Sequence, residues 1–151
     1  MVRQCHNYTC RFAQEAIKLH AIPFRSMQLI QERITVLSEA VPMLWFLFCE
    51  ARDVVIEPDA KAGLPENSKA ITEASIEVLE EIQLSQWQTE TIQQVLNTKL
   101  IEQMGEKPRN AFGPLRTGIS GRRVSPPLFE SMEILGKEET LARLKLFASH
   151  V

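Results

Sequence analysis

The sequence predicts an all-α protein built from two small helical subdomains. Apolar residues recur at helical spacing along almost all of the 151 residues, and no alternation of apolar and polar residues indicates a strand. A chain of this length can bury a core without disulfides or metal ions. Its hydrophobic content of 44% is that of a folded protein, which excludes disorder of the whole chain.

Two helices are expected in the N-terminal third of the chain, before the connector that follows. A first helix is expected over residues 24–39, where Ile30, Ile34 and Leu37 share one face at i, i+4 and i+7. Pro42 lacks an amide hydrogen and would interrupt that helix. We therefore expect Pro42 to open a second helix, which is apolar nearly all round and should be buried.

Residues 53–66 are expected to form a connector between the N-terminal helices and those that follow. Pro58, Gly63 and Pro65 punctuate it, and residues 54–56 could form a short extended piece.

Two amphipathic helices are expected next. Asn67 or Ser68 can cap the first, whose outer side is acidic. The second follows Trp87, with Thr89 as a plausible cap and Gly105 at its end. Their apolar stripes are Ile71, Ala74, Val78, Leu79 and Ile82, and then Ile92, Val95, Leu96 and Leu100.

The C-terminal part begins with a Gly- and Pro-rich segment, residues 107–127. It predicts a short helix around residues 111–119 and a loop over residues 121–127. Pro127 suits the first turn of a further helix, which Gly136 would close. A last helix has an apolar stripe of Leu141, Leu144 and Phe147.

The net charge of −2 averages regions of opposite sign. Residues 53–90 contain nine acids and two bases, whereas residues 107–129 contain five bases and no acid. Before residue 34, five bases face two acids. Such asymmetry indicates a polyanionic partner at particular segments, although solvated faces with chance clustering remain an alternative.

The sequence shows no complete active site. It contains no Gly-rich phosphate loop, no Gly-x-Ser-x-Gly motif and no run of ~18 apolar residues that could cross a membrane. Cys5, His6 and Cys10 are not followed by the second ligand pair that zinc would need. We expect no catalytic residue and no metal site, and the three cysteines, an odd number, favour the reducing cytoplasm.

The basic loop has chemistry suited to single-stranded RNA. Arg116 offers a planar fork of donors for a phosphate or a base edge, and Arg122 and Arg123 can reach backbone phosphates. Ser125 adds a hydroxyl and an amide near a helix start, and the two prolines after it stiffen the loop. RNA is bound by such mixtures, but a capped corner with solvated arginines would give the same pattern.

Residues 107–144, KPRNAFGPLRTGISGRRVSPPLFESMEILGKEETLARL, closely resemble the C-terminal end of bacterial-type glutamyl-tRNA synthetases. The matching motifs are Pro-Leu-Arg at 114–116, Gly121, Ser-Pro-Pro-Leu-Phe-Glu at 125–130 and Leu-Gly-Lys-Glu at 135–138. Residues 28–48 are similar to the first helices of that family's anticodon-binding region. Trp87 and Thr89 resemble a Trp-Thr pair that opens a helix there, with one residue inserted. The resemblance covers about residue 24 to the end.

The resemblance implies an α-helical anticodon-binding cage and assigns roles to individual residues. Arg25 and Arg33 would approach the anticodon from the first subdomain, with Arg33 reading the third base, and Arg116 would contact a base from the second. The spacing of eight between Arg25 and Arg33 allows them to share a helix face. The implied anticodon-binding residues are Arg25, Arg33, Arg116, Ser125, Pro126 and Leu128, with Arg122 and Arg123 near the tRNA backbone.

The same resemblance implies an organisation and a function. Residues 23–52 would end the first subdomain and residues 53–151 would form the second, with residues 1–22 unassigned. The His-Ile-Gly-His-like motif and the Lys-rich loop of the family's catalytic domain do not occur. We therefore expect a truncated frame or fragment that binds tRNA(Glu) as the C-terminal part of a glutamate–tRNA ligase. It would not catalyse aminoacylation alone.

We expect no cofactor in this chain, because ATP and Mg²⁺ would belong to the missing catalytic domain. We also expect a monomer without membrane contact. The alternative is an orphaned helical protein-interaction module that does not bind RNA. Its partner surface would be the acidic face at Glu73, Glu77 and Glu80.

Overall fold

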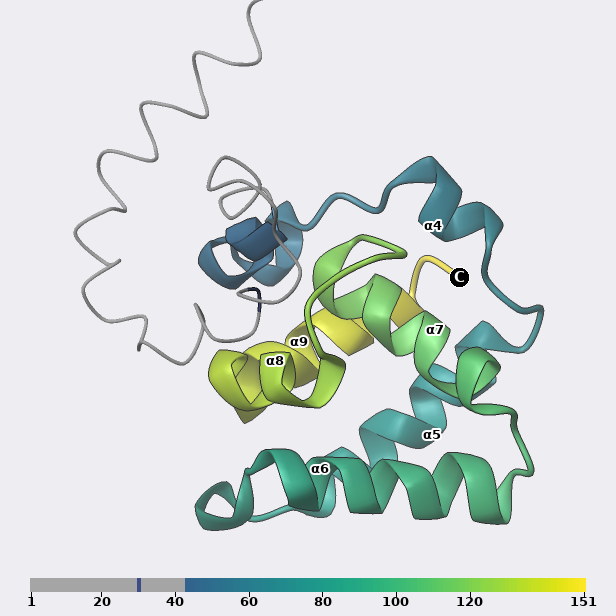
Figure 1. Ribbon diagram of the computed structural model, residues 1–151, viewed down its shortest axis with the longest axis vertical. Helices are drawn as coiled ribbons and strands as arrows, with labels where there is room; N and C mark the ends of the chain where they lie inside the picture. The colour runs from purple at the N-terminus through teal and green to yellow at the C-terminus, as the bar shows by residue number, and fades with distance from the viewer. Residues whose placement is uncertain (1–29, 31–42) are drawn as a thin grey trace, which may run out of the picture.

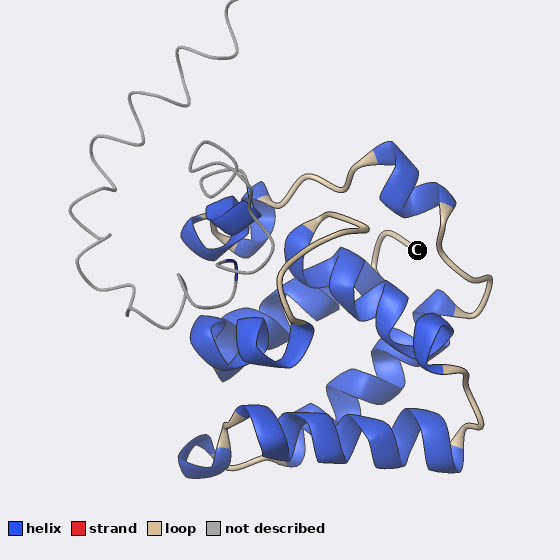
Figure 2. Ribbon diagram, in the orientation of Figure 1, coloured by secondary structure: helices blue, strands red, loops and turns tan. Residues whose placement is uncertain are grey.

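The computed structural model describes Ile30 and residues 43–151, and this part is built from helices (Figures 1 and 2). The elements are η3 (Trp45–Phe48), η4 (Ala51–Asp53), α4 (Pro58–Ala62), α5 (Ser68–Glu81), η5 (Leu84–Gln86), α6 (Thr89–Leu96), η6 (Asn97–Gln103), α7 (Pro108–Ser120), α8 (Leu128–Leu135) and α9 (Lys137–Ala148). The η elements are 3₁₀ helices except η6, a π-helix that continues α6. The described residues contain no strand, which confirms the all-α class. The helix expected over residues 24–39 lies outside the described residues except for Ile30.

The core lies where α5, α7 and α9 meet, with α6 packed against α8 (Figure 1). Gly118 allows α7 and α9 to come close, because a Cβ at this position would lie only 3.1 Å from the Phe147 ring. The buried core residues are Phe46, Ile71, Leu79, Ile82, Trp87, Ile92, Leu96, Leu100, Ala111, Leu115, Ile119, Leu128, Met132 and Leu144. Half of them come from the predicted apolar stripes, and most of these lie on α5 and on α6–η6, whose inward faces helical periodicity identified correctly.

A second, smaller cluster lies at the N-terminal side of the described part. Ile30 and Leu44 are buried together, with Met43, Leu47 and Phe48 packed against them. The apolar helix expected after Pro42 is present from Met43, but it tightens into the 3₁₀ helix η3.

The helix α5 begins where the sequence predicts, but neither candidate side chain caps it. Asn67 occupies the N-cap position, yet its side-chain amide donates a hydrogen bond to Glu106 Oε1 at 2.6 Å. The Ser68 hydroxyl donates to the carbonyl of Pro65. Asn67 therefore ties two distant segments together, which local capping rules do not reveal, whereas Ser68 closes the turn before α5.

The start of α6 is fixed by α8 and not by a local cap. Thr89 is the first residue of α6, and its backbone N–H and Oγ1 donate to Glu133 Oε2 at 2.6 and 2.5 Å. Trp87 Nε1 donates to the carbonyl oxygen of Met132 at 3.0 Å. The sequence predicted Thr89 as a capping residue, but Glu133 supplies the acceptor from 44 residues away.

The helix α7 is longer than the predicted residues 111–119. It starts at Pro108, since a proline in the first turn leaves no amide that needs a helical partner. It continues past Pro114 and ends at Gly121, whose φ of 72° is left-handed. At that conformation the Gly121 amide donates to the Thr117 carbonyl at 2.8 Å. The predicted loop over residues 121–127 follows.

Candidate nucleic-acid interface

The loop between α7 and α8 (residues 121–127) contains most of the predicted binding residues of the described part. Its first residue, Gly121, is anchored through its backbone to the connector before α4. The Glu57 amide donates to the Gly121 carbonyl at 2.8 Å, and a Cβ on Gly121 would lie 2.2 Å from the Val55 carbonyl oxygen. Only glycine fits this contact, so the start of the loop has a defined position.

Arg116 ties the far end of this loop to α7. Its Nη1 donates to three oxygens: Ser125 Oγ at 3.1 Å, the Ser125 carbonyl at 3.3 Å and the Pro126 carbonyl at 3.0 Å. Ser125 is buried, and its hydroxyl also donates to the Pro126 carbonyl at 3.2 Å. The structure thus brings Arg116, Ser125 and Pro126 into one cluster. Arg116 thus holds the end of the loop against its own guanidinium group. A nucleotide that binds here would meet this cation in a fixed geometry.

Leu128, another predicted binding residue, is the first residue of α8 and belongs to the hydrophobic core. Only 4% of its surface is exposed. Next to it, Phe129 is half-buried and packs edge-on against Phe112, with ring centroids 5.3 Å apart. Leu128 therefore holds the start of α8 in place, and its contact with a nucleotide remains a prediction.

The two adjacent loop arginines have different surroundings. Arg122 Nε lies 2.9 Å from Glu57 Oε1, and both side chains are partly exposed. Arg123 is exposed, and its Nε would be 3.9 Å from a Cβ placed on Gly63 at the end of α4. Both arginines thus lie along the connector. The Arg122 amide also donates to Ser120 Oγ at 3.3 Å, which fixes the turn that follows α7.

Two contributors to this surface were missed by sequence reasoning. Val124 lies between Arg123 and Ser125, and 75% of its surface is exposed, which offers apolar contact beside the cations. Its position in the predicted loop could have suggested it. Glu57 is the partner of Arg122, but 65 residues separate the two in the chain, so no local pattern indicates the pair. The remaining predicted residues, Arg25 and Arg33, lie outside the described residues.

A buried arginine, Arg143, holds the end of α7 from which the loop starts. Arg143 of α9 is 1% exposed, and its Nη1 donates to the Ile119 carbonyl at 2.8 Å, in the last turn of α7. Its Nη2 donates to the Cys49 carbonyl at 2.6 Å, and its Nε to Glu139 Oε1 at 2.8 Å. Arg143 thereby joins α7, α9 and the segment after η3 at one point. No local pattern indicates this role, because an arginine in an amphipathic helix is usually solvated.

Cys49 lies at the same junction, where its surroundings shift the pKa of its thiol. Burial raises the pKa of the Cys49 thiol, while the positive charge of Arg143 opposes that rise. The thiol also donates to the Phe46 carbonyl at 3.5 Å. These contacts favour a protonated, weakly reactive thiol.

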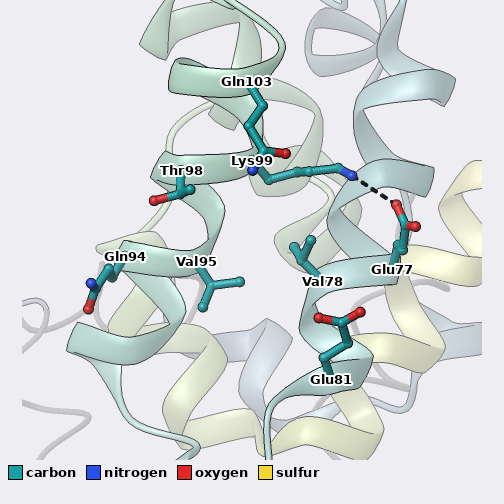
Figure 3. Close-up of a pocket in the computed structure, with 8 residues that line it drawn as sticks. All are labelled: Glu77, Val78, Glu81, Gln94, Val95, Thr98, Lys99 and Gln103. Carbon is teal, nitrogen blue, oxygen red and sulfur yellow. Dashed lines mark hydrogen bonds and ion pairs between the residues drawn. The ribbon is translucent and has the colours of Figure 1, made fainter.

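A groove of about 390 Å³ lies away from the loop, between α5 and the continuous helix α6–η6 (Figure 3). The Lys99 side chain crosses it and contacts Glu77 at 3.0 Å. The lining residues are Glu77, Val78, Glu81, Gln94, Val95, Thr98, Lys99 and Gln103. None of them is a predicted anticodon-binding residue, so this groove and the basic loop are separate features.

The described part of the chain offers neither a metal site nor a membrane span. Within Ile30 and residues 43–151, no group of three His, Cys, Asp or Glu side chains could hold a metal ion. In the same part of the chain, no helix is both long and apolar enough to cross a membrane.

Comparison with known proteins points to one family. Residues 2–148 match the family described as "Anticodon binding domain". A glutamate–tRNA ligase of Leifsonia xyli subsp. xyli is 53% identical over 131 residues, which cover 87% of this chain and 26% of that protein. One from Paenarthrobacter aurescens is 50% identical over 134 residues, or 89% of this chain and 25% of that protein. The chain thus spans about a quarter of the length of these curated relatives.

A solved structure confirms the fold. The crystal structure of a glutamate tRNA ligase from Elizabethkingia meningosepticum, in complex with its amino acid, aligns with a TM-score of 0.71. The alignment covers 83% of this chain and 24% of that one, at 21% sequence identity.

Proposed function

Because the chain belongs to the anticodon binding domain family, we propose that it binds the anticodon of tRNA(Glu) as part of a glutamate–tRNA ligase. The observation that carries this proposal is the cluster of Arg116, Ser125 and Pro126, in which one guanidinium orders a loop from an acid-free segment. The identities of 53% and 50% to glutamate–tRNA ligases support the choice of tRNA.

In this proposal the chain recognises tRNA and leaves the chemistry to another domain. The relatives are about four times as long as the matched region, which leaves room for a nucleotide-binding domain. ATP and Mg²⁺ would serve that domain, where glutamate is joined to the acceptor end. The described part would position the tRNA by its anticodon, as a monomer in the cytoplasm.

The binding surface would be shared between two subdomains. We place the end of the first within residues 23–52 and the second within residues 53–151. Arg25 and Arg33 would approach the anticodon from the first. From the second, Arg116 and the loop would contact bases, while Arg122 and Arg123 would attract backbone phosphates.

The protein-interaction alternative has less support from the comparisons. It requires the acidic face of α5 to bind a partner protein. Glu77 forms an ion pair with Lys99 at 3.0 Å and Glu80 forms one with Lys145 at 2.5 Å, but exposed pairs of this kind are weak, so the face remains accessible. The family match and the identities to glutamate–tRNA ligases favour tRNA binding over this alternative.

The test compares full-length chain binding to two tRNAs that differ only in the anticodon. We expect tRNA(Glu) to bind more tightly than the same tRNA with its anticodon scrambled. The affinity for both should fall as salt rises, because phosphate contacts release counterions. Equal affinity for the two tRNAs would contradict anticodon recognition, and affinity independent of salt would contradict the role of the arginines.

Variants of two arginines separate base contacts from backbone contacts. Arg116→Ala should weaken binding of tRNA(Glu) by ~1–3 kcal/mol and relax discrimination at one base. Arg122→Ala should weaken binding of both tRNAs alike and lower the salt slope by about one. If both variants weaken the binding of both tRNAs by the same amount, Arg116 does not contribute to discrimination between anticodons.

A further inference from the structure

The connector before α4 runs along the basic loop, and its position does not depend on charge. The Glu57 amide donates to the Gly121 carbonyl at 2.8 Å. Gly121 in turn approaches Val55 so closely that an added Cβ would lie 2.2 Å from the Val55 carbonyl oxygen. Two backbone contacts therefore hold residue 57 beside the loop, whatever its side chain is.

The Glu57 side chain is directed to the loop and not to its own helix. Glu57 precedes α4 at the N-cap position but makes no capping hydrogen bond. Instead, Glu57 Oε1 lies 2.9 Å from Arg122 Nε. This places a carboxylate where an arginine of a nucleic-acid surface would hold a phosphate oxygen.

The pair is accessible enough to exchange partners. The Arg122 and Glu57 side chains are 39% and 42% exposed, so a phosphate can approach the guanidinium from solvent. Exposed ion pairs of this kind are weak. The loop itself contains no acid, since residues 107–129 hold bases alone, and the acidic connector supplies the negative charge.

We propose that Glu57 is an affinity-limiting residue that competes with the tRNA backbone for Arg122. This inference rests on the proposed function, because it assumes that Arg122 meets phosphate. A phosphate that approaches Arg122 must displace the carboxylate from Nε or lie beside its negative charge, and this cost is the same for every anticodon. Glu57 would therefore lower the affinity for all tRNAs equally and promote their release, while discrimination stays with the Arg116 cluster.

The test is Glu57→Gln, which removes the charge and keeps the shape and the backbone contact with Gly121. We expect the variant to bind tRNA(Glu) and the anticodon-scrambled tRNA each about two- to five-fold more tightly than the wild-type chain. The ratio between the two tRNAs should not change. The salt slope should steepen, because Arg122 would engage a phosphate more fully.

Two controls isolate the contact. Asp59→Asn removes an exposed acid two residues away in α4 and should change affinity by less than Glu57→Gln, because Asp59 is not the ion-pair partner of Arg122. In an Arg122→Gln background, Glu57→Gln should have no further effect, since the competing partner is gone. An equal gain in both backgrounds would overturn the proposal and indicate a general charge effect.

The outcomes distinguish this inference from the proposed function. Weaker or unchanged tRNA binding by Glu57→Gln would overturn the proposed competition. It would indicate that the ion pair between Glu57 and Arg122 only stabilises the loop. If Glu57→Gln tightens both tRNAs but the wild type does not discriminate between them, the competition stands and anticodon recognition fails. If neither tRNA binds either chain, both proposals fail.

Discussion

Two arginines of the described part, Arg143 and Arg122, show how burial decides what a guanidinium does. Arg143 is 1% exposed, and each of its three nitrogens donates to an oxygen within the chain. Arg122 is 39% exposed and faces the carboxylate of Glu57 through its Nε. A buried cation must be fully satisfied, so it fixes structure. A cation at the surface can exchange its partner at little cost, so it suits the binding of a ligand.

The two regions are linked through the end of α7. Arg143 donates to the Ile119 carbonyl, two residues before the glycine at which the loop starts. The buried junction therefore fixes the base of the loop, whereas the loop presents its charges to solvent. Substitutions in the junction should act on stability first, and those of the exposed loop arginines on binding first.

The largest effect is expected from Arg143→Met. It should lower the free energy of unfolding by about 3–5 kcal/mol, because Glu139 and two backbone carbonyls would lose a buried partner. Urea denaturation measures the change. Lys145→Met is the matched control on the same helix, since its ion pair with Glu80 is exposed and should be worth less than ~1 kcal/mol. Similar losses for both variants would contradict the structural role of Arg143.

The next effect concerns the contact between loop and connector. Gly121→Ala should destabilise the fold by ~3 kcal/mol, the upper end of the cost of a strained backbone, because its Cβ would clash with the Val55 carbonyl. Gly105→Ala is the control: φ is similar at 69°, yet no atom lies within 4 Å of the added Cβ. It should cost only ~1 kcal/mol, the penalty for the left-handed conformation. Equal losses would show that the connector yields readily.

The difference between local packing and tertiary contacts also explains which features could be predicted from the sequence. Periodicity identified the helices because packing repeats every turn, as the buried Ile71, Leu79 and Leu144 show. Glycines and prolines likewise located the loop. The partner of each polar side chain is set by the tertiary fold, so Glu133 at the start of α6 and Glu57 beside Arg122 could not be read locally.

The residues of the candidate site were likewise predicted only in part. The family resemblance supplied Arg116, Ser125 and Pro126, and the structure brings these three together. Leu128, from the same motif, lies in the core, because a residue in the first turn of α8 can face inward as readily as toward a ligand. A motif marks residues that a family retains without separating those that bind from those that support the binding residues.

The smallest effect tests the junction through its thiol. Burial raises the pKa of Cys49, so the folded state holds the thiol proton more tightly than the unfolded chain does. The resulting stability is complete below the ordinary thiol pKa of ~8.5 and is lost as the pH rises through the higher folded value. The difference in unfolding free energy between the wild type and Cys49→Ala should therefore shrink between about pH 8 and pH 10. Parallel pH profiles would mean that solvent reaches this thiol, and that the junction around Arg143 is as open as the loop it supports.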